Sequence, residues 1–123
     1  MTEEDVAREV VDAALAVHRE LGPGLLESAY EQCLAFELGR RGLTVERQKE
    51  VPIMYQGTRI DAGYRIDLLV DGSIIVELKA VDRVAPVHKA QLLSYLRLAE
   101  LRIGFLINFH VRLLKDGIRR LMA

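Results

Sequence analysis

Hydrophobic residues in the first forty positions recur every three or four residues, as on one face of an α-helix. This spacing predicts an amphipathic helix over residues 3–20 and a second over residues 25–40. Gly22-Pro23-Gly24 separates them, because proline cannot continue a helix and glycine tolerates a positive φ. The buried positions are expected to be Val6, Val10, Ala14, Val17 and Leu21 in the first helix and Leu26, Tyr30, Cys33/Leu34 and Leu38 in the second.

From Thr44 onward the hydrophobic period changes to two, which is typical of β-strands. A turn at Gln56-Gly57 divides the first strand from a second one that runs to Val70. Asp71-Gly72 predicts a tight hairpin into Ile74–Lys79, a segment apolar enough for the centre of a sheet. One face of the second strand is expected to carry Ile60, Ala62, Tyr64, Ile66, Leu68 and Val70.

The last third of the chain predicts a helix and a further strand. Pro86 suits the first turn of a helix that ends near Ala99, and residues 103–109 form a nearly continuous apolar strand. Residues 111–123 are assigned to an edge element. The sequence thus predicts one domain over residues 1–123, of the mixed α/β (α+β) class, with a four-stranded mixed sheet flanked by helices. The helix between the third and fourth strands makes that pair parallel if adjacent, and the first three strands form an antiparallel meander.

Composition limits the cellular context. Cys33 is the only cysteine among 123 residues, which excludes an internal disulfide and a multi-cysteine metal site within one chain. Residues 1–12 hold five acids and one arginine, unlike a signal or transit peptide, and no apolar run approaches the ~20 residues of a membrane span. We expect a cytoplasmic protein without membrane contact.

Charge is unevenly distributed along the chain. Residues 1–37 hold nine acids and two arginines, whereas the remainder has a net charge of +6 and the whole chain −1. The basic part can attract phosphate, although an acidic helix packed beside a basic sheet would give the same pattern.

Candidate chemistry lies between Asp67 and Lys79. Glu77 and Lys79 share a face of a predicted central strand, and a buried carboxylate without a partner costs several kcal/mol. Glu77 must therefore pair with a base or hold a cation. On the following helix, His88, Gln91 and Tyr95 share a face, directed at the same site or forming a polar surface stripe.

Glu27 supplies a third acid at the start of the second helix. Its spacing from Tyr30 and Leu34 directs it inward, although an acid in a first turn also interacts favourably with the helix dipole.

The register between the second and third predicted strands decides whether Asp67 and Glu77 can bind the same cation. A two-residue turn at Asp71-Gly72 would place Asp67 across from Val76 and put the two acids on opposite faces. Shared ligation requires a three-residue loop over residues 71–73 or a bulge, and we predict one of these.

Two groups of residues resemble known families. The segment Gly24-Leu25-Leu26-Glu27-Ser28-Ala29-Tyr30 resembles the signature of the GxxExxY protein family. Asp67, Glu77-Leu78-Lys79 and Gln91-xxx-Tyr95 resemble the PD-(D/E)xK nuclease core of the RecB and archaeal Holliday-junction-resolvase kind. The resemblance implies a restriction-endonuclease-like αβββαβ core and a magnesium-dependent nuclease-like site.

The resemblance leads to a hypothesis of metal-dependent phosphodiester hydrolysis. It implies a cation, Mg²⁺ or Mn²⁺, held by Asp67, Glu77, the Leu78 carbonyl and Glu27. Lys79 and Gln91 would act in catalysis together with Glu27. Contacts to nucleic acid, expected to be DNA, are assigned to Arg65, Arg83, Lys89 and Tyr95, with a more distant basic cluster at Arg112, Lys115, Arg119 and Arg120.

Three hypotheses about the function remain open at this point. The first is a nuclease, expected to be a homodimer because so small a chain covers little duplex. The second is a catalytically inactive nuclease-fold module that binds nucleic acid or a protein partner. The third is a metal-dependent hydrolase of small phosphorylated ligands, which would need a closed pocket.

Overall fold

The structure, a computed structural model, describes all 123 residues. It contains a five-stranded mixed sheet, a separate two-stranded hairpin and three α-helices. The elements in chain order are α1 (Glu3–Leu21), α2 (Glu27–Arg40), β1 (Val45–Glu50), β2 (Ile53–Tyr55), β3 (Thr58–Ile60), β4 (Arg65–Val70), β5 (Ile74–Lys79), α3 (Pro86–Ala99), β6 (Ile103–Asn108), the 3₁₀ turn η1 (Leu114–Asp116) and β7 (Ile118–Met122).

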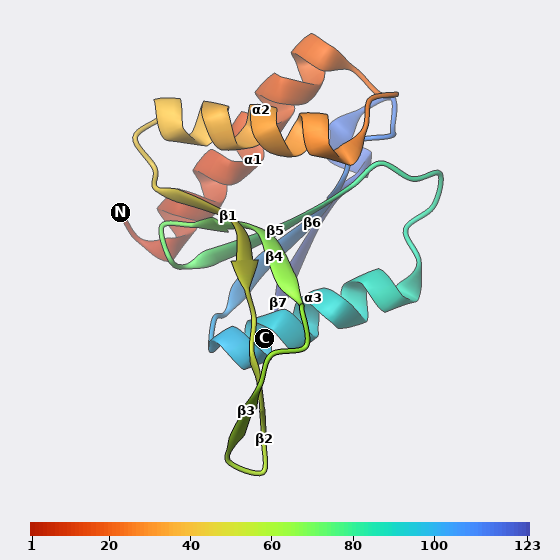
Figure 1. Cartoon of the computed structure of the whole chain (residues 1–123). Helices are drawn as coiled ribbons and strands as arrows, with labels where there is room; N and C mark the ends of the chain where they lie inside the picture. Colours follow the sequence, from red (N-terminus) through yellow and green to blue (C-terminus); the bar gives the residue numbers. More distant parts are fainter.

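The helices form layers on both sides of the sheet. Figure 1 shows α1 and α2 over one face, α3 beneath the other, and the β2–β3 hairpin projecting away from the body. The strand order is β1-β4-β5-β6-β7. β1, β4 and β5 are antiparallel, β5 and β6 are parallel and joined by α3, and β7 closes the far edge antiparallel to β6. The predicted parallel pair and antiparallel meander are confirmed.

Local sequence rules account for the helix ends. The side chain of Thr2 accepts a hydrogen bond from the Asp5 N–H, and the Asp5 carboxylate accepts one from the Thr2 N–H, which forms a capping box for α1. Gly22, at φ 67°, ends α1 as predicted. The predicted third helix coincides with α3, which begins at Pro86.

Several details of the prediction are wrong. Leu21 is exposed at the last position of α1, and Ile60, Ala62 and Tyr64 are exposed because they lie in and after the β2–β3 hairpin, outside the five-stranded sheet. The sheet has five strands because the tail supplies β7, and the long second strand is interrupted over residues 61–64. Leu26 is exposed because α2 begins at Glu27 and not at residue 25, so this side chain precedes the first turn. Cys33 is also exposed, because the neighbouring Leu34 takes the buried position.

Hydrophobic clusters occupy both faces of the sheet. The larger one joins α1 and α2 to the central strands and includes Val10, Leu34 and Val76. The smaller one joins α3 to the opposite face and includes Leu92 and Ile75. Adjacent β5 residues thus lie in different cores, as the alternation of side chains along a strand requires.

Strand β4 does not keep this alternation. Ile66 belongs to the cluster under α3, but Leu68 belongs to the cluster under α1 and α2, although two residues separate them. The expectation that both share one face is therefore wrong. The break occurs at Asp67, whose N–H bonds to the side chain of Glu77 in β5 and not to a backbone carbonyl of a neighbouring strand.

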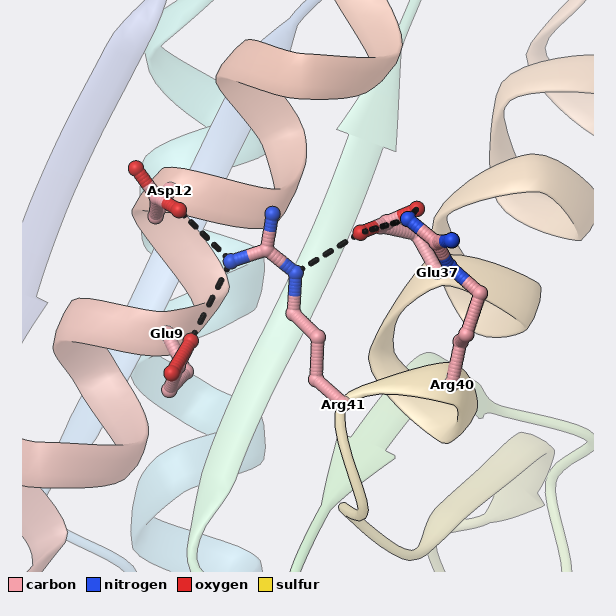
Figure 2. A network of polar contacts seen from close by, with 5 residues as sticks. All are labelled: Glu9, Asp12, Glu37, Arg40 and Arg41. Atoms are coloured by element: carbon pink, nitrogen blue, oxygen red, sulfur yellow. Dashed lines mark hydrogen bonds and ion pairs between the residues drawn. The ribbon is translucent and has the colours of Figure 1, made fainter.

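An ion-pair cluster joins α1 to α2. Figure 2 shows Arg41, immediately after α2, reaching between Glu9 and Asp12 of α1 and Glu37 of α2. Its guanidinium lies 3.2 Å from Glu9, 2.6 Å from Asp12 and 2.8 Å from Glu37. We call these four residues the Arg41 cluster. Each carboxylate in it contacts the same guanidinium, so one arginine connects the two helices through charge-assisted contacts.

Candidate metal and nuclease site

The turn between β4 and β5 brings Asp67 and Glu77 together. Val70 pairs with Ile74, which leaves a three-residue loop over residues 71–73 and confirms the predicted loop. Asp71 and Gly72 adopt the left-handed conformation in it, at φ 51° and 63°. Continuing the observed register places Asp67 across from Glu77.

The two carboxylates bind backbone groups of each other's strand. The Asp67 N–H donates to Oε1 of Glu77 at 3.1 Å, and the Leu78 N–H donates to Oδ2 of Asp67 at 2.9 Å. Regular strand pairing reaches Leu68 and Val76 and is replaced beyond that point by these side-chain contacts. The pair is therefore fixed by two strands in the middle of a sheet.

Electrostatics make this pair unusual. Glu77 is 5 % exposed, and neither it nor Asp67 forms an ion pair with a base. The pKa of Glu77 is raised to about 9, mainly by burial. The negative charge of Asp67 and the side-chain hydrogen bond with it also raise this pKa. The site therefore contains more negative charge than the protein alone neutralises. A proton or a cation is needed to make the pair stable.

Lys79 and Tyr95 lie close enough to the pair to interact with it electrostatically, whereas no contact places Gln91 beside it. Lys79 is half-buried, and its charge acts to lower the pKa of Glu77 although no ion pair forms. Tyr95 is buried, and its pKa rises to about 12 through burial and the nearby charges of Glu77 and Asp67. Gln91 lines a hollow with Tyr95 and Tyr64, whose rings meet edge to face at 6.1 Å. No hydrogen bond joins Gln91 to Lys79, so its orienting role stays a prediction.

The expected orientation of Glu27 is wrong. This residue is exposed at the first position of α2, since helical side chains tilt toward the N-terminus and a first-turn side chain extends past the helix end. Consistent with this, no group of three or more His, Cys, Asp or Glu side chains is close enough to hold a metal ion. A role for Glu27 as a ligand stays a prediction without a supporting contact.

Glu31, one turn further along α2, is the buried acid that sequence reasoning missed. It is 8 % exposed and bonds to Arg47 and Gln48 of β1, and Gln48 also reaches Asp67. A sequence signal existed, because Glu31 stands at i, i+3 and i+7 with the buried Leu34 and Leu38. No comparable signal marked Gln48.

Basic side chains lie beside the site. Arg65 borders a polar hollow of about 460 Å³ along β1, together with Arg47, Lys49 and Arg59. Arg83 and Lys89 are exposed, the first within the β5–α3 connection and the second in the first turn of α3. In the C-terminal basic cluster, Arg120 is bound by Glu4, so this arginine is engaged with α1. The contacts predicted for these bases with nucleic acid remain predictions.

Comparison with protein families accounts for this combination of sheet and carboxylate pair. The family model of the PD-(D/E)XK nuclease superfamily matches residues 4–121, nearly the whole chain. The chain belongs to the PD-(D/E)XK nuclease superfamily. Its five-stranded mixed sheet flanked by helices is consistent with a restriction-endonuclease-like fold. No curated protein and no solved structure matches the chain.

The match does not assign individual site residues. The prediction that Asp67 is the Asp of the superfamily name, with Ile66 where the name has proline, and that Glu77-Leu78-Lys79 is its Glu-x-Lys stays a prediction. PD-(D/E)XK nucleases typically use divalent metals. Two carboxylates from neighbouring strands, one buried and one half-buried and neither with a basic partner, are a donor set that suits a hard divalent cation. No helix of the chain has the combined length and apolar character needed to cross a membrane.

Proposed function

We propose that the chain hydrolyses phosphodiester bonds in nucleic acid with the help of Mg²⁺ or Mn²⁺. The observation that carries this proposal is the pairing of Asp67 and Glu77 across β4 and β5, one of them buried, with no base to neutralise them. A purely structural acid would gain by having such a base.

The proposed roles follow the geometry. Asp67 and Glu77 hold the cation with their carboxylate oxygens, and the Leu78 carbonyl is a further proposed ligand. The cation, when bound, makes water more acidic and offsets charge that develops on the scissile phosphate. Lys79 donates from its ammonium to orient the attacking water, whose proton passes to solvent. Water oxygen bonds to phosphorus, the P–O bond to the leaving group breaks, and that group takes a proton from solvent.

Other proposed roles rest on position alone. Gln91 orients Lys79 or a phosphate oxygen, and Tyr95 supports it from below. Arg65, Arg83 and Lys89 contact phosphates of the substrate.

We further propose a DNA substrate, membership of the GxxExxY family and a cytoplasmic location, where Cys33 stays reduced. A homodimer would extend the contact with a duplex, and light scattering on the purified chain would measure its mass.

A cleavage assay tests the proposed function. The full chain is incubated with end-labelled DNA and RNA, each single-stranded and duplex, with Mg²⁺, with Mn²⁺ and with chelator. We expect metal-dependent cleavage that is lost in Asp67→Ala and Lys79→Ala, while circular dichroism shows both variants folded. Equal cleavage by wild type and both variants would defeat the proposal. Binding of nucleic acid without cleavage, and without stabilisation by the metal, would favour the catalytically inactive module.

A further inference from the structure

Gln48 has an unusual backbone at the position across from Asp67. β1 and β4 pair on either side of it, Arg47 with Leu68 and Lys49 with Ile66, so the intervening Gln48 faces Asp67. Gln48 is left-handed, with φ 53°, inside a segment that is otherwise a regular strand. A residue other than glycine adopts this conformation only when its surroundings compensate for the strain.

The side chain of Gln48 provides this compensation. Its Nε2 donates to Oε1 of Glu31 at 2.7 Å and to Oδ1 of Asp67 at 3.3 Å. One amide nitrogen carries two hydrogens, so it can serve both carboxylates at once. Glu31 is itself held by Arg47, at 3.0 Å from Nη2 and 3.3 Å from Nε. The amide is thus anchored on an ion pair between α2 and β1, in which Glu31 is buried and Arg47 is exposed.

Both oxygens of Asp67 are consequently fixed. Oδ1 accepts from Gln48 on the β1 side, and Oδ2 accepts from the Leu78 N–H on the β5 side. Both donors are neutral, so they orient the carboxylate while leaving its negative charge available. A lysine or arginine in place of Gln48 would neutralise that charge and compete with a cation.

We propose that Gln48 is a positioning residue, whose amide, anchored on Glu31 and Arg47, holds Asp67 in the orientation that binds a divalent cation. This inference rests on the proposed function, since it assigns Asp67 to cation binding. Groups that orient metal ligands through hydrogen bonds typically change metal affinity by 10- to 100-fold when removed.

The chain contains a matched control for this proposal. Gln56, in the turn between β2 and β3, is also a glutamine with φ 53°, and its side chain makes no hydrogen bond. Gln48→Gly and Gln56→Gly therefore remove the same atoms and relieve the same backbone strain. Only the first removes a contact with Asp67.

The test measures Mn²⁺ affinity on the full chain by electron paramagnetic resonance titration, independently of cleavage. We expect Gln48→Gly to weaken Mn²⁺ binding by about 10- to 100-fold and Gln56→Gly to leave it unchanged. The thermal unfolding midpoint of Gln56→Gly should equal or exceed that of wild type, whereas Gln48→Gly also loses the hydrogen bonds to Glu31 and Asp67 and should unfold at a lower temperature than Gln56→Gly. Gln48→Asn, which tolerates the left-handed region but has a shorter side chain, should also bind more weakly and serves if the glycine variant unfolds.

Each outcome has a distinct meaning. If wild type binds Mn²⁺, Asp67→Asn does not, and the Gln48 variants bind as wild type does, the positioning role is overturned and the proposed function stands. A wild-type chain that does not bind Mn²⁺ overturns both. Equal losses in Gln48→Gly and Gln56→Gly would indicate a general backbone effect and would also overturn the positioning role.

Discussion

Two groups of carboxylates in this small chain have opposite electrostatic surroundings. In the Arg41 cluster, three acids surround one guanidinium at 2.6 to 3.2 Å. Hydrogen bonding to Arg41 lowers the pKa of Asp12 and of Glu37. The same contacts raise the pKa of Arg41. These acids stay charged, and they join two helices.

The Asp67–Glu77 pair has the reverse character. Burial and a neighbouring carboxylate raise the pKa of Glu77, and no arginine or lysine makes an ion pair with either acid. The comparison shows that the acids that join the two helices have an arginine partner. Asp67 and Glu77 have no basic partner and depend on a cation or a proton, and this dependence can be measured.

The largest expected difference between the two groups is in catalysis. Asp67→Asn should reduce cleavage by about a thousandfold or more, since a direct ligand contributes more than the 10- to 100-fold of a supporting group. Arg41→Met should leave cleavage near the wild-type rate. Initial rates on the same labelled substrate compare them. A similar loss in both variants would show that the assay follows folding and not the site.

The next effect is a pH dependence of stability in the metal-free chain. A pKa of about 9, against an ordinary value of 4.5, means that folded Glu77 keeps a proton that the unfolded chain releases between these values. The stabilisation is therefore complete below about pH 4.5 and is lost as the pH rises through about 9. In urea unfolding experiments with chelator, the free energy of unfolding of wild type should fall by up to about 1.4 kcal/mol per unit rise in pH, relative to that of Glu77→Gln. Parallel stability curves would contradict this assignment.

A third difference concerns added metal. If Mn²⁺ binds the folded site as proposed, and not the unfolded chain, a hundredfold excess over its dissociation constant should add about 2.7 kcal/mol to the free energy of unfolding at neutral pH. The gain should disappear in Asp67→Asn and persist in Arg41→Met. Differential scanning calorimetry with and without Mn²⁺ measures it, and a gain that survives in Asp67→Asn would place the ion elsewhere.

The smallest expected effect belongs to the Arg41 cluster. Arg41→Met removes partly exposed ion pairs and should lower the melting temperature by only a few degrees at low ionic strength. In about 1 M salt the difference should shrink, because salt screens exposed charges. Thermal melts at two salt concentrations test this. A salt-independent loss would indicate packing by the arginine stem instead.

Features fixed by local chemistry could be predicted from the sequence. The ends of α1 and α3 follow from Thr2, Gly22 and Pro86, and the parity of Glu77 and Lys79 follows from strand geometry. The three-residue loop followed from one condition, that Asp67 and Glu77 share a site.

Features that depend on several elements could not be predicted in this way. The sequence spacing places both Glu27 and Glu31 on the stripe of α2 that faces the core. The structure exposes Glu27, because it stands at the end of the helix, and buries Glu31 one turn further along. The left-handed backbone of Gln48 depends on partners in α2 and β4. Neither arrangement leaves a periodic pattern in the sequence.

The loop between β4 and β5 makes the candidate site sensitive to chain length as well as to residue identity. Removing one loop residue would slide the two strands past each other by one position and turn Glu77 toward the opposite layer. The core could then repack while every residue of the Asp…Glu-x-Lys pattern remained in the sequence. Among chains of this architecture, the number of residues between the Asp and the Glu therefore distinguishes two groups. In one the two acids can meet across the strands, and in the other the motif residues are present but lie on opposite faces.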